Sequence, residues 1–168
     1  METMQERDRW IEDMMTQWEV PLLRTCFLIL RDAHMAEDAV QESFIKAWRA
    51  YEKRRKDASD QGFLMRIAVN TCRDMMRSKW MRHQQRSVAL DDLPEPGVPF
   101  EMPDDTLTRA VLALPDALRQ CVVLRFYQGF SAEEIARMTK CSRRSVYYRL
   151  DQAQRLLKSS LKEWYDAE

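Results

Sequence analysis

The stretch that decides the fold is residues 131–150, which read SAEEIARMTKCSRRSVYYRL. Ser131 followed by Glu134 is the pattern of a capping box, in which each side chain accepts a hydrogen bond from the other residue's backbone N–H, so a short helix is expected to begin there. A brief break at Lys140-Cys141 separates that helix from a second one. The pattern therefore predicts a helix-turn-helix.

The second helix of this motif has an apolar face and a polar face. Its apolar residues recur at helical spacing and are predicted to face inward: Val146, Leu150, Ala153 and Leu157. The opposite face carries Arg144, Tyr148, Asp151 and Arg155, with Tyr147 and Gln152 on its flanks. A recognition helix presents base- and phosphate-reading groups on such a face. The alternative is a three-helix module whose polar face only meets water.

Charge is distributed in blocks along a chain that is neutral overall. Residues 1–48 hold 5 basic and 10 acidic side chains, whereas 49–86 hold 11 basic and 4 acidic ones. Residues 87–105 hold 6 acidic and no basic side chains, and 106–168 hold 11 basic and 7 acidic ones. Two basic blocks fit two contacts to one polyanion, although charge clustering on solvated helix faces gives the same pattern.

Helical spacing of apolar residues also recurs upstream of the motif. With only 3 glycines and no clear alternation of period two, a sheet is disfavoured. One helix is predicted to end before Pro21, and a second is predicted to start there. A third is predicted over 36–47, followed by a polar break at 53–61 and a fourth helix over 63–83.

A proline-rich, acidic segment at 88–105 divides the chain. It contains 4 of the 6 prolines, so an extended linker is expected. Beyond it, one short helix is predicted over 106–114 and another from Pro115. We therefore predict an all-α protein of two small helical domains, an N-terminal helical bundle at 1–87 and a C-terminal helix-turn-helix domain at 106–168, joined by the acidic Pro-rich linker.

Composition excludes several functional classes. The 4 cysteines are scattered without a CxxC pair and the 2 histidines lie far apart, so no metal site, cofactor or catalytic centre is expected. Reduced thiols in a cytoplasmic protein are the favoured interpretation. No apolar run is long enough for a membrane span or an export signal. The expectation is a cytoplasmic protein that is not an enzyme and does not insert into a membrane.

Four stretches, taken in order, resemble one protein family. They are DAVQESFIKAW at 38–48, RIAVNTCRDMMR at 66–77, LALPDALRQCVVLRF at 112–126 and the motif at 131–150. The combination is similar to the extracytoplasmic-function class of bacterial sigma factors, the promoter-recognition subunits of RNA polymerase. A helix-turn-helix alone would be less specific than these motifs at this spacing.

The resemblance implies that the helix at 38–48 docks on the clamp helices of core RNA polymerase. The residues assigned to this contact are Asp38, Gln41, Glu42, Phe44, Ile45 and Trp48. The acidic balance of residues 1–48 suits a protein partner better than DNA. The resemblance also implies that the C-terminal domain rests on the polymerase flap and that the linker runs toward the RNA exit path.

The resemblance further implies capture of unstacked bases of the −10 promoter element. The loop at about 54–60 resembles one that receives a flipped base. The residues assigned to the −10 element are Arg54, Arg55, Lys56, Met65, Arg66, Asn70, Arg73, Arg77, Lys79 and Arg82. Basic side chains interleaved with rings suit single-stranded nucleic acid. Asn70 itself has two interpretations, a hydrogen-bonded core residue or a reader of a base edge.

The helix-turn-helix would read the −35 element as duplex DNA. The residues assigned to this contact are Arg143, Arg144, Tyr147, Tyr148, Asp151, Gln152 and Arg155. The family commonly has a basic residue and a serine where this chain has Tyr147-Tyr148, and arginines further along the helix. Because Asp accepts from the cytosine amino group and Tyr can pack on a thymine methyl, the base preference is expected to differ.

Two other functional classes stay open at this point. A free-standing helix-turn-helix regulator would bind duplex DNA alone, at palindromic sites, and a helical adaptor would bind no nucleic acid. The sigma-factor hypothesis instead predicts weak DNA binding alone and strong promoter binding with core polymerase. Because family members are commonly held by an anti-sigma factor, such a factor is a candidate partner.

Overall fold

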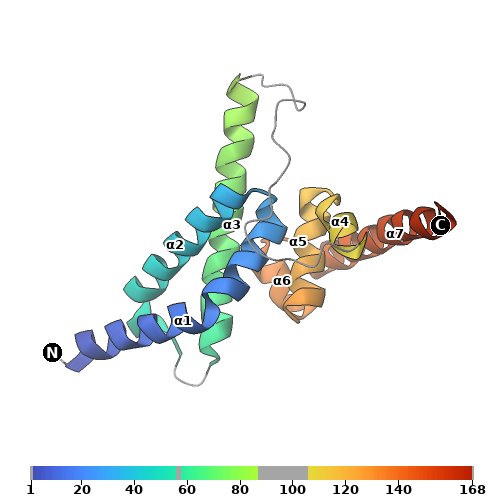
Figure 1. Cartoon of the computed structure of the whole chain (residues 1–168). Coiled ribbons are helices and arrows are strands. Elements are labelled where there is room, and N and C mark those ends of the chain that lie inside the picture. The colour runs from blue at the N-terminus through green and yellow to red at the C-terminus, as the bar shows by residue number, and fades with distance from the viewer. Residues whose placement is uncertain (1, 56–57, 87–105, 168) are drawn as a thin grey trace. The chain divides into compact units, whose positions relative to one another are not determined.

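A computed structural model describes the backbone of residues 2–55, 58–86 and 106–167 (Figure 1). Side chains are described over 4–55, 58–78 and 106–162. Every regular element within these ranges is a helix, and the predicted all-α class is confirmed. The chain divides into two compact units, Met1–Gly97 and Val98–Glu168. The linker predicted at 88–105 lies outside the described residues.

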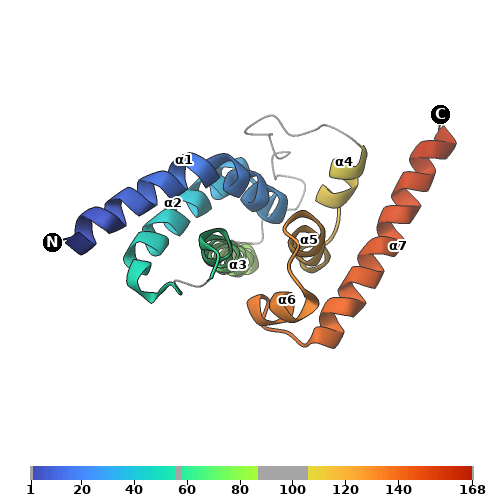
Figure 2. The same ribbon diagram turned by 90° about the horizontal axis from the view of Figure 1, so that it is seen from below.

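Three long helices make up the first unit (Figures 1 and 2). They are α1 (Glu2–Leu30), α2 (Ala33–Arg49) and α3 (Asp60–Arg86), and each packs against the other two. A short turn of 3₁₀-helix, η1 (Tyr51–Lys53), connects α2 to the loop before α3. The centre of the unit is built from side chains of all three helices, among them Cys26, Phe27, Ala39, Ala47, Leu64 and Cys72.

A single helix spans the region where two were predicted, so the predicted break at Pro21 is wrong. Pro21 lies inside α1, and Figure 1 shows the helix changing direction along its length. An internal proline costs about 3 kcal/mol because it lacks the N–H of the helical ladder. The residues that follow it, Leu22, Cys26 and Ile29, are at most 1 % exposed. Burial contributes about 1.5–3 kcal/mol per large aliphatic side chain, which is enough to outweigh the proline.

A tight reversal joins α1 to α2. Arg31 has a left-handed backbone with φ 58°, and its N–H donates to the carbonyl of Phe27 at 2.7 Å, which ends α1. Asp32 then caps α2 by accepting from the backbone N–H of Met35 at 3.0 Å. At the other end, Lys46 and Arg49 lie in the last turn, where the helix dipole favours cations.

The second unit contains four short elements and one long helix. These are α4 (Thr106–Leu112), α5 (Asp116–Val122), the π-helical turn η3 (Val123–Tyr127), α6 (Ala132–Met138) and the long α7 (Arg143–Ala167). The helices α4, α5 and α6 contact α7. Three of the four residues predicted to face inward on α7 are buried, Val146, Leu150 and Ala153, and Leu157 is half-buried.

Arg119 is a buried charge that fixes the connection between α4 and α5. Its side chain is 1 % exposed. It donates to the carbonyl of Leu114 at 2.7 Å and to the carboxylate of Asp116 at 2.6 Å. A buried guanidinium is tolerated when its donors are paired in this way.

The helix-turn-helix has the capping box and the break between its helices that were predicted. The Ser131 hydroxyl accepts from the N–H of Glu134 at 3.1 Å, and the Glu134 carboxylate accepts from the N–H of Ser131 at 3.3 Å, so the capping box is confirmed. After α6, Lys140 adopts a left-handed backbone with φ 52°. The N–H of Cys141 then donates to the carbonyl of Ala136 at 3.0 Å.

The cysteine thiols differ in their environments. Cys26, Cys72 and Cys121 are buried, whereas Cys141 is half-buried. The neighbouring Cys26 thiol, together with burial, raises the pKa of Cys72 well above its usual value. Burial raises the pKa of Cys121 as well, against a smaller opposing effect of Arg149.

We expect a maleimide to label Cys141 first when the folded protein is treated near pH 7. The thiolate is the reacting form, and a raised pKa keeps Cys72 and Cys121 protonated in addition to their being buried. Peptide mass spectrometry over a time course measures the order, with the urea-denatured protein as the control in which all four thiols react together. Early labelling of Cys72 or Cys121 in the folded protein would contradict this expectation.

Candidate nucleic-acid and protein interfaces

The outer face of α2 gathers most of the residues assigned to polymerase binding. Asp38, Gln41, Glu42 and Ile45 are all exposed. They recur at i, i+3, i+4 and i+7, so they form one stripe along the helix. We call these four residues the α2 stripe. Ile45, at the C-terminal end of the stripe, is 45 % exposed, which adds an apolar side chain to the polar ones.

Phe44 does not belong to this surface, which corrects its assignment to polymerase binding. Its side chain is 5 % exposed and lies on the buried face of α2, as do Ala39, Val40 and Ala47. One residue along a helix is a rotation of about 100°, so Phe44 points away from the α2 stripe and into the core. It supports the helix and is not available to a partner.

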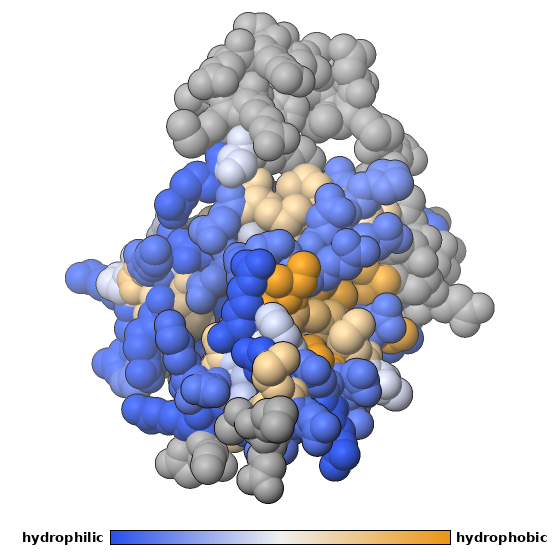
Figure 3. All heavy atoms as spheres, turned by 90° about the vertical axis from the view of Figure 1, so that its left-hand side faces the viewer, coloured by the Kyte–Doolittle hydropathy of each residue, from blue (hydrophilic) through white to orange (hydrophobic). Residues whose placement is uncertain are grey.

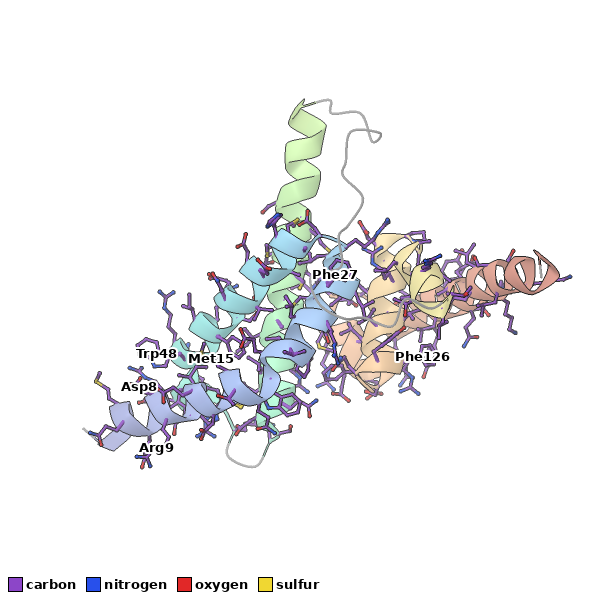
Figure 4. All side chains as sticks on the ribbon, viewed as in Figure 1. Asp8, Arg9, Met15, Phe27, Trp48 and Phe126 are labelled. Atoms are coloured by element: carbon purple, nitrogen blue, oxygen red, sulfur yellow. The ribbon has the colours of Figure 1, made fainter. Side chains whose placement is uncertain are left out.

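Trp48, at the end of α2, is held by the N-terminal part of α1 (Figure 4). Its indole N–H donates to the carboxylate of Asp8 at 2.7 Å. The Arg7 guanidinium lies 3.8 Å from the centroid of the indole ring. Trp48 is therefore half-buried and already has partners within the chain.

An open groove of about 610 Å³ runs between α2 and α3. The carboxylates of Asp38, Glu42 and Asp74 line it, and Lys46 is the cation among its lining residues. The Lys46 ammonium donates to the hydroxyl of Thr71 at 3.1 Å, on the α3 side. Among the described residues that line the groove there are three carboxylates and one ammonium, so the groove suits a cationic segment of a partner.

A polar stripe runs along α3. Arg66, Asn70, Arg73 and Arg77 recur at i, i+4, i+7 and i+11 and share one face. Arg66, Asn70 and Arg77 are exposed and Arg73 is half-buried. We call these four residues the α3 stripe. Because Asn70 is exposed, the interpretation of it as a core residue is wrong.

Met65 was assigned to the same DNA contact but lies in the core. Its side chain is 4 % exposed, on the face of α3 that also buries Ala68, Val69 and Cys72. Its assignment to the −10 contact is therefore corrected. Lys56 lies outside the described residues, as do the side chains of Lys79 and Arg82.

Arg54, the first residue of the loop before α3, is engaged within the protein. Its guanidinium lies 4.3 Å from the centroid of the Tyr51 ring and 5.2 Å from that of Trp10. It also pairs with Asp60 at 3.5 Å. Its side chain is only 19 % exposed, whereas Arg55, the next residue, is exposed. Sequence reasoning missed Trp10 and Asp60, because contacts across 50 residues leave no local pattern.

The polar face of α7 is presented as predicted. Tyr147 is 59 % and Tyr148 66 % exposed. Arg143, Arg144, Asp151 and Arg155 are also exposed, and Gln152 is half-buried.

Two ion pairs occupy part of this face. Arg143 pairs with Glu133 of α6 at 2.7 Å, and Arg155 pairs with Asp151 at 3.2 Å. Exposed pairs of this kind contribute little to stability, so they can exchange for DNA contacts.

Two further kinds of site are absent from the part of the chain that the structure describes. Within them, no helix has the length and apolar content needed to cross a membrane. Over the same residues, no group of three or more His, Cys, Asp or Glu side chains is arranged to hold a metal ion.

Comparison with known structures shows the fold. The sigma factor RpoE bound to the anti-sigma factor NepR, from Bartonella quintana, superposes with a TM-score of 0.71 at 21 % identity, covering 90 % of this chain and 96 % of that one. CnrH, in complex with the cytosolic domain of CnrY, gives a TM-score of 0.60 at 20 % identity, covering 93 % and 90 %.

Comparison of sequences identifies the family. Residues 14–82 match Sigma-70 region 2 and residues 104–157 match Sigma-70 region 4. The RNA polymerase sigma-H factor of Pseudomonas aeruginosa is 27 % identical over 96 % of this chain and 91 % of its own length. The ECF RNA polymerase sigma-E factor of Salmonella typhimurium is 34 % identical over 69 % of this chain and 68 % of its own length.

A free-standing helix-turn-helix regulator does not account for the region 2 match, which covers the helices that carry the α2 and α3 stripes. The α7 face falls within the region 4 match. The chain belongs to the extracytoplasmic-function class of RNA polymerase sigma factors and acts in the initiation of transcription.

Proposed function

We propose that this sigma factor uses the α3 stripe to capture single-stranded bases of the −10 element and the polar face of α7 to read the −35 duplex. The observation that carries the proposal is the alignment of Arg66, Asn70, Arg73 and Arg77 on one face of α3. The proposed domains are region 2 at 1–87, a linker at 88–105 and region 4 at 106–168. The protein would work in the cytoplasm through binding energy alone, without chemistry of its own.

A base is captured when its contacts with the protein offset the free energy that unstacking costs. Flipping a base costs a few kcal/mol, and stacking on a protein surface contributes about 1–3 kcal/mol per base. In this arrangement the guanidinium groups of the α3 stripe neutralise phosphates, which holds the strand without reading it. The Asn70 amide has both a donor and an acceptor, so it can bond to the edge of a base.

The α2 stripe and the acidic groove beside it are proposed to bind core RNA polymerase. Interfaces commonly combine exposed apolar and polar side chains, and the stripe presents Ile45 at the end of a row of polar residues. Figure 3 shows a largely hydrophilic face with hydrophobic side chains gathered in one area. The related structures hold RpoE with NepR and CnrH with CnrY. We propose that this chain is likewise held by an anti-sigma factor.

Replacement of Asn70 by alanine is expected to lower initiation while −35 duplex binding persists, because a base contact is lost from an exposed position that does not support the fold. Permanganate reactivity of unpaired thymines in the holoenzyme–promoter complex measures open-complex formation. Gln17→Ala, which likewise removes an exposed amide but from α1, is the control. Open complexes of Asn70→Ala equal to those of the parent would refute the role of Asn70.

Replacement of Tyr148 or Arg144 by alanine is expected to change the −35 sequence preferred by the holoenzyme. A base contact contributes about 1–3 kcal/mol of discrimination, so the preference should relax at one or two positions. Selection from promoters randomised in the −35 element measures this, with Ser160→Ala further along α7 as the control. The same selected motif from mutants and parent would contradict the proposal.

Reversal of charge at Glu42 is expected to weaken binding to core polymerase, because Glu42 belongs both to the α2 stripe and to the acidic groove. Co-purification and titration with core polymerase compare Glu42→Lys with Glu37→Lys. Glu37 is also exposed on α2 but lies outside the stripe. Glu37→Lys therefore changes the net charge by the same amount at another place on the same helix. Equal loss in both variants would indicate a general charge effect and argue against a specific docking stripe.

A further inference from the structure

Two cysteines that are well separated in the sequence meet at the turn of the helix-turn-helix. Cys121 belongs to α5 and is buried, whereas Cys141 lies between α6 and α7 and is half-buried. Burial raises the pKa of the Cys121 thiol most, and the charge of Cys141 raises it further, so the two thiols are neighbours. The sequence shows no pattern that pairs them.

The guanidinium of Arg149, on α7, lies against both thiols. It donates to the sulfur of Cys141 at 3.6 Å. It also hydrogen-bonds to Cys121 and lowers the pKa of that thiol, against the larger opposite effect of burial. Arg149 is half-buried, so a positive charge is held next to the pair of sulfur atoms.

Thr139 completes the surroundings of the Cys141 sulfur. The Thr139 hydroxyl donates to the carbonyl of Ile135 at 2.7 Å, and its oxygen lies 3.2 Å from Sγ of Cys141. Because a hydroxyl has one hydrogen, the Cys141 S–H donates to the Thr139 oxygen. We call Cys121, Thr139, Cys141 and Arg149 the thiol cluster.

The surroundings of Cys141 favour reaction with an oxidant. Reactive cysteines are partly exposed and lie beside positive charge, and Cys141 has both features. Cys26 and Cys72, the neighbouring pair in the first unit, are both 0 % exposed. Hydrogen bonding to Cys26 and burial both raise the pKa of Cys72. The two pairs are therefore expected to differ in reactivity.

We propose that Cys141 is a site of oxidation by hydrogen peroxide, with Cys121 as the thiol that resolves it into a disulfide. The Cys141 sulfur attacks one peroxide oxygen and the O–O bond breaks, which gives a sulfenic acid. The proton lost from the thiol joins the leaving hydroxide as water. The Cys121 sulfur then attacks the sulfenic sulfur, the S–S bond forms and a second water leaves with the Cys121 proton.

Oxidation at this place acts on the start of α7. Ser142, the residue after Cys141, caps α7 by accepting from the N–H of Ser145 at 3.0 Å, and Arg144 and Tyr148 follow on the exposed face. A disulfide to α5 takes the sulfur from its present partners and displaces the turn from which α7 begins. Weaker binding to the −35 duplex follows, an inference that rests on the proposed function of α7.

The test treats the chain with hydrogen peroxide, removes the peroxide with catalase and then adds untreated core polymerase. Peptide mass spectrometry is expected to find Cys121 linked to Cys141, with Cys26 and Cys72 still thiols. The affinity of this holoenzyme for a fluorescent duplex carrying the −35 element is expected to fall about tenfold, because base contacts are lost. Dithiothreitol is expected to restore the affinity.

Three variants assign the effect to the thiol cluster. Cys141→Ser should bind DNA as the parent does and resist peroxide. It retains all 11 methionines, so any loss of affinity after its treatment measures methionine oxidation. Cys26→Ala, the matched control, removes a cysteine of the other pair and should stay as sensitive as the parent. Arg149→Gln should slow the oxidation of Cys141 several-fold, since the charge beside the sulfur is lost.

Cys121→Ser separates the two chemical steps. The sulfenic acid at Cys141 should persist in this variant and be trapped by dimedone. If Cys121→Ser does not fold, the disulfide mapped in the parent and the resistance of Cys141→Ser decide.

Four results would overturn the proposal. They are a Cys141 thiol that survives peroxide, a disulfide that joins two copies of the chain, a Cys141→Ser variant as sensitive as the parent, and unchanged −35 affinity of the disulfide form. Failure of the untreated parent holoenzyme to bind the −35 duplex would instead defeat the proposed function. Mass spectrometry measures the disulfide independently of DNA binding, so the two failures are distinguishable.

Discussion

The rotation of α3 about its own axis is the constraint on which the proposed DNA surface depends. Leu64, Ala68 and Val69 are each 1 % exposed, and burial of such side chains contributes about 1.5–3 kcal/mol for the large ones. A rotation by one residue, about 100°, would expose them and bring guanidinium groups into the core. The buried face therefore holds the α3 stripe outward.

The same constraint operates in α2 and α7. Burial of Ala39, Ala47 and their neighbours turns the α2 stripe outward. Burial of Val146 and Ala153 likewise turns the tyrosine pair of α7 toward solvent. The exposed residues are thereby free to vary without loss of the fold. A change at Tyr147 or Tyr148, which are 59 % and 66 % exposed, leaves the packing of the helix as it is, and in the proposed function it alters what the helix reads.

Most of the sequence-based prediction rested on the helical spacing of apolar residues, and the errors of that prediction have physical causes. The helical class, the capping box at Ser131 and the outward face of α7 follow from local spacing, and each was predicted. Phe44 and Met65 were misassigned because a motif taken from a family includes the residues that support a surface along with those that form it. Burial of a particular apolar residue depends on tertiary packing, which a motif does not display.

The error at Pro21 and the contacts missed at Trp10 have one origin. Proline was interpreted by its local effect on a helix, whereas tertiary burial on its C-terminal side keeps α1 continuous. Continuity matters for the other half of the helix, because it carries Trp10, whose indole N–H donates to the Asp60 carboxylate at 3.1 Å. The core residues after Pro21 and the contacts of Trp10 before it thus belong to a single bent helix. Burial of the apolar residues after Pro21 sets the direction of α1. Hydrogen bonds and stacking at Trp48 and Asp60 then hold its N-terminal half in position.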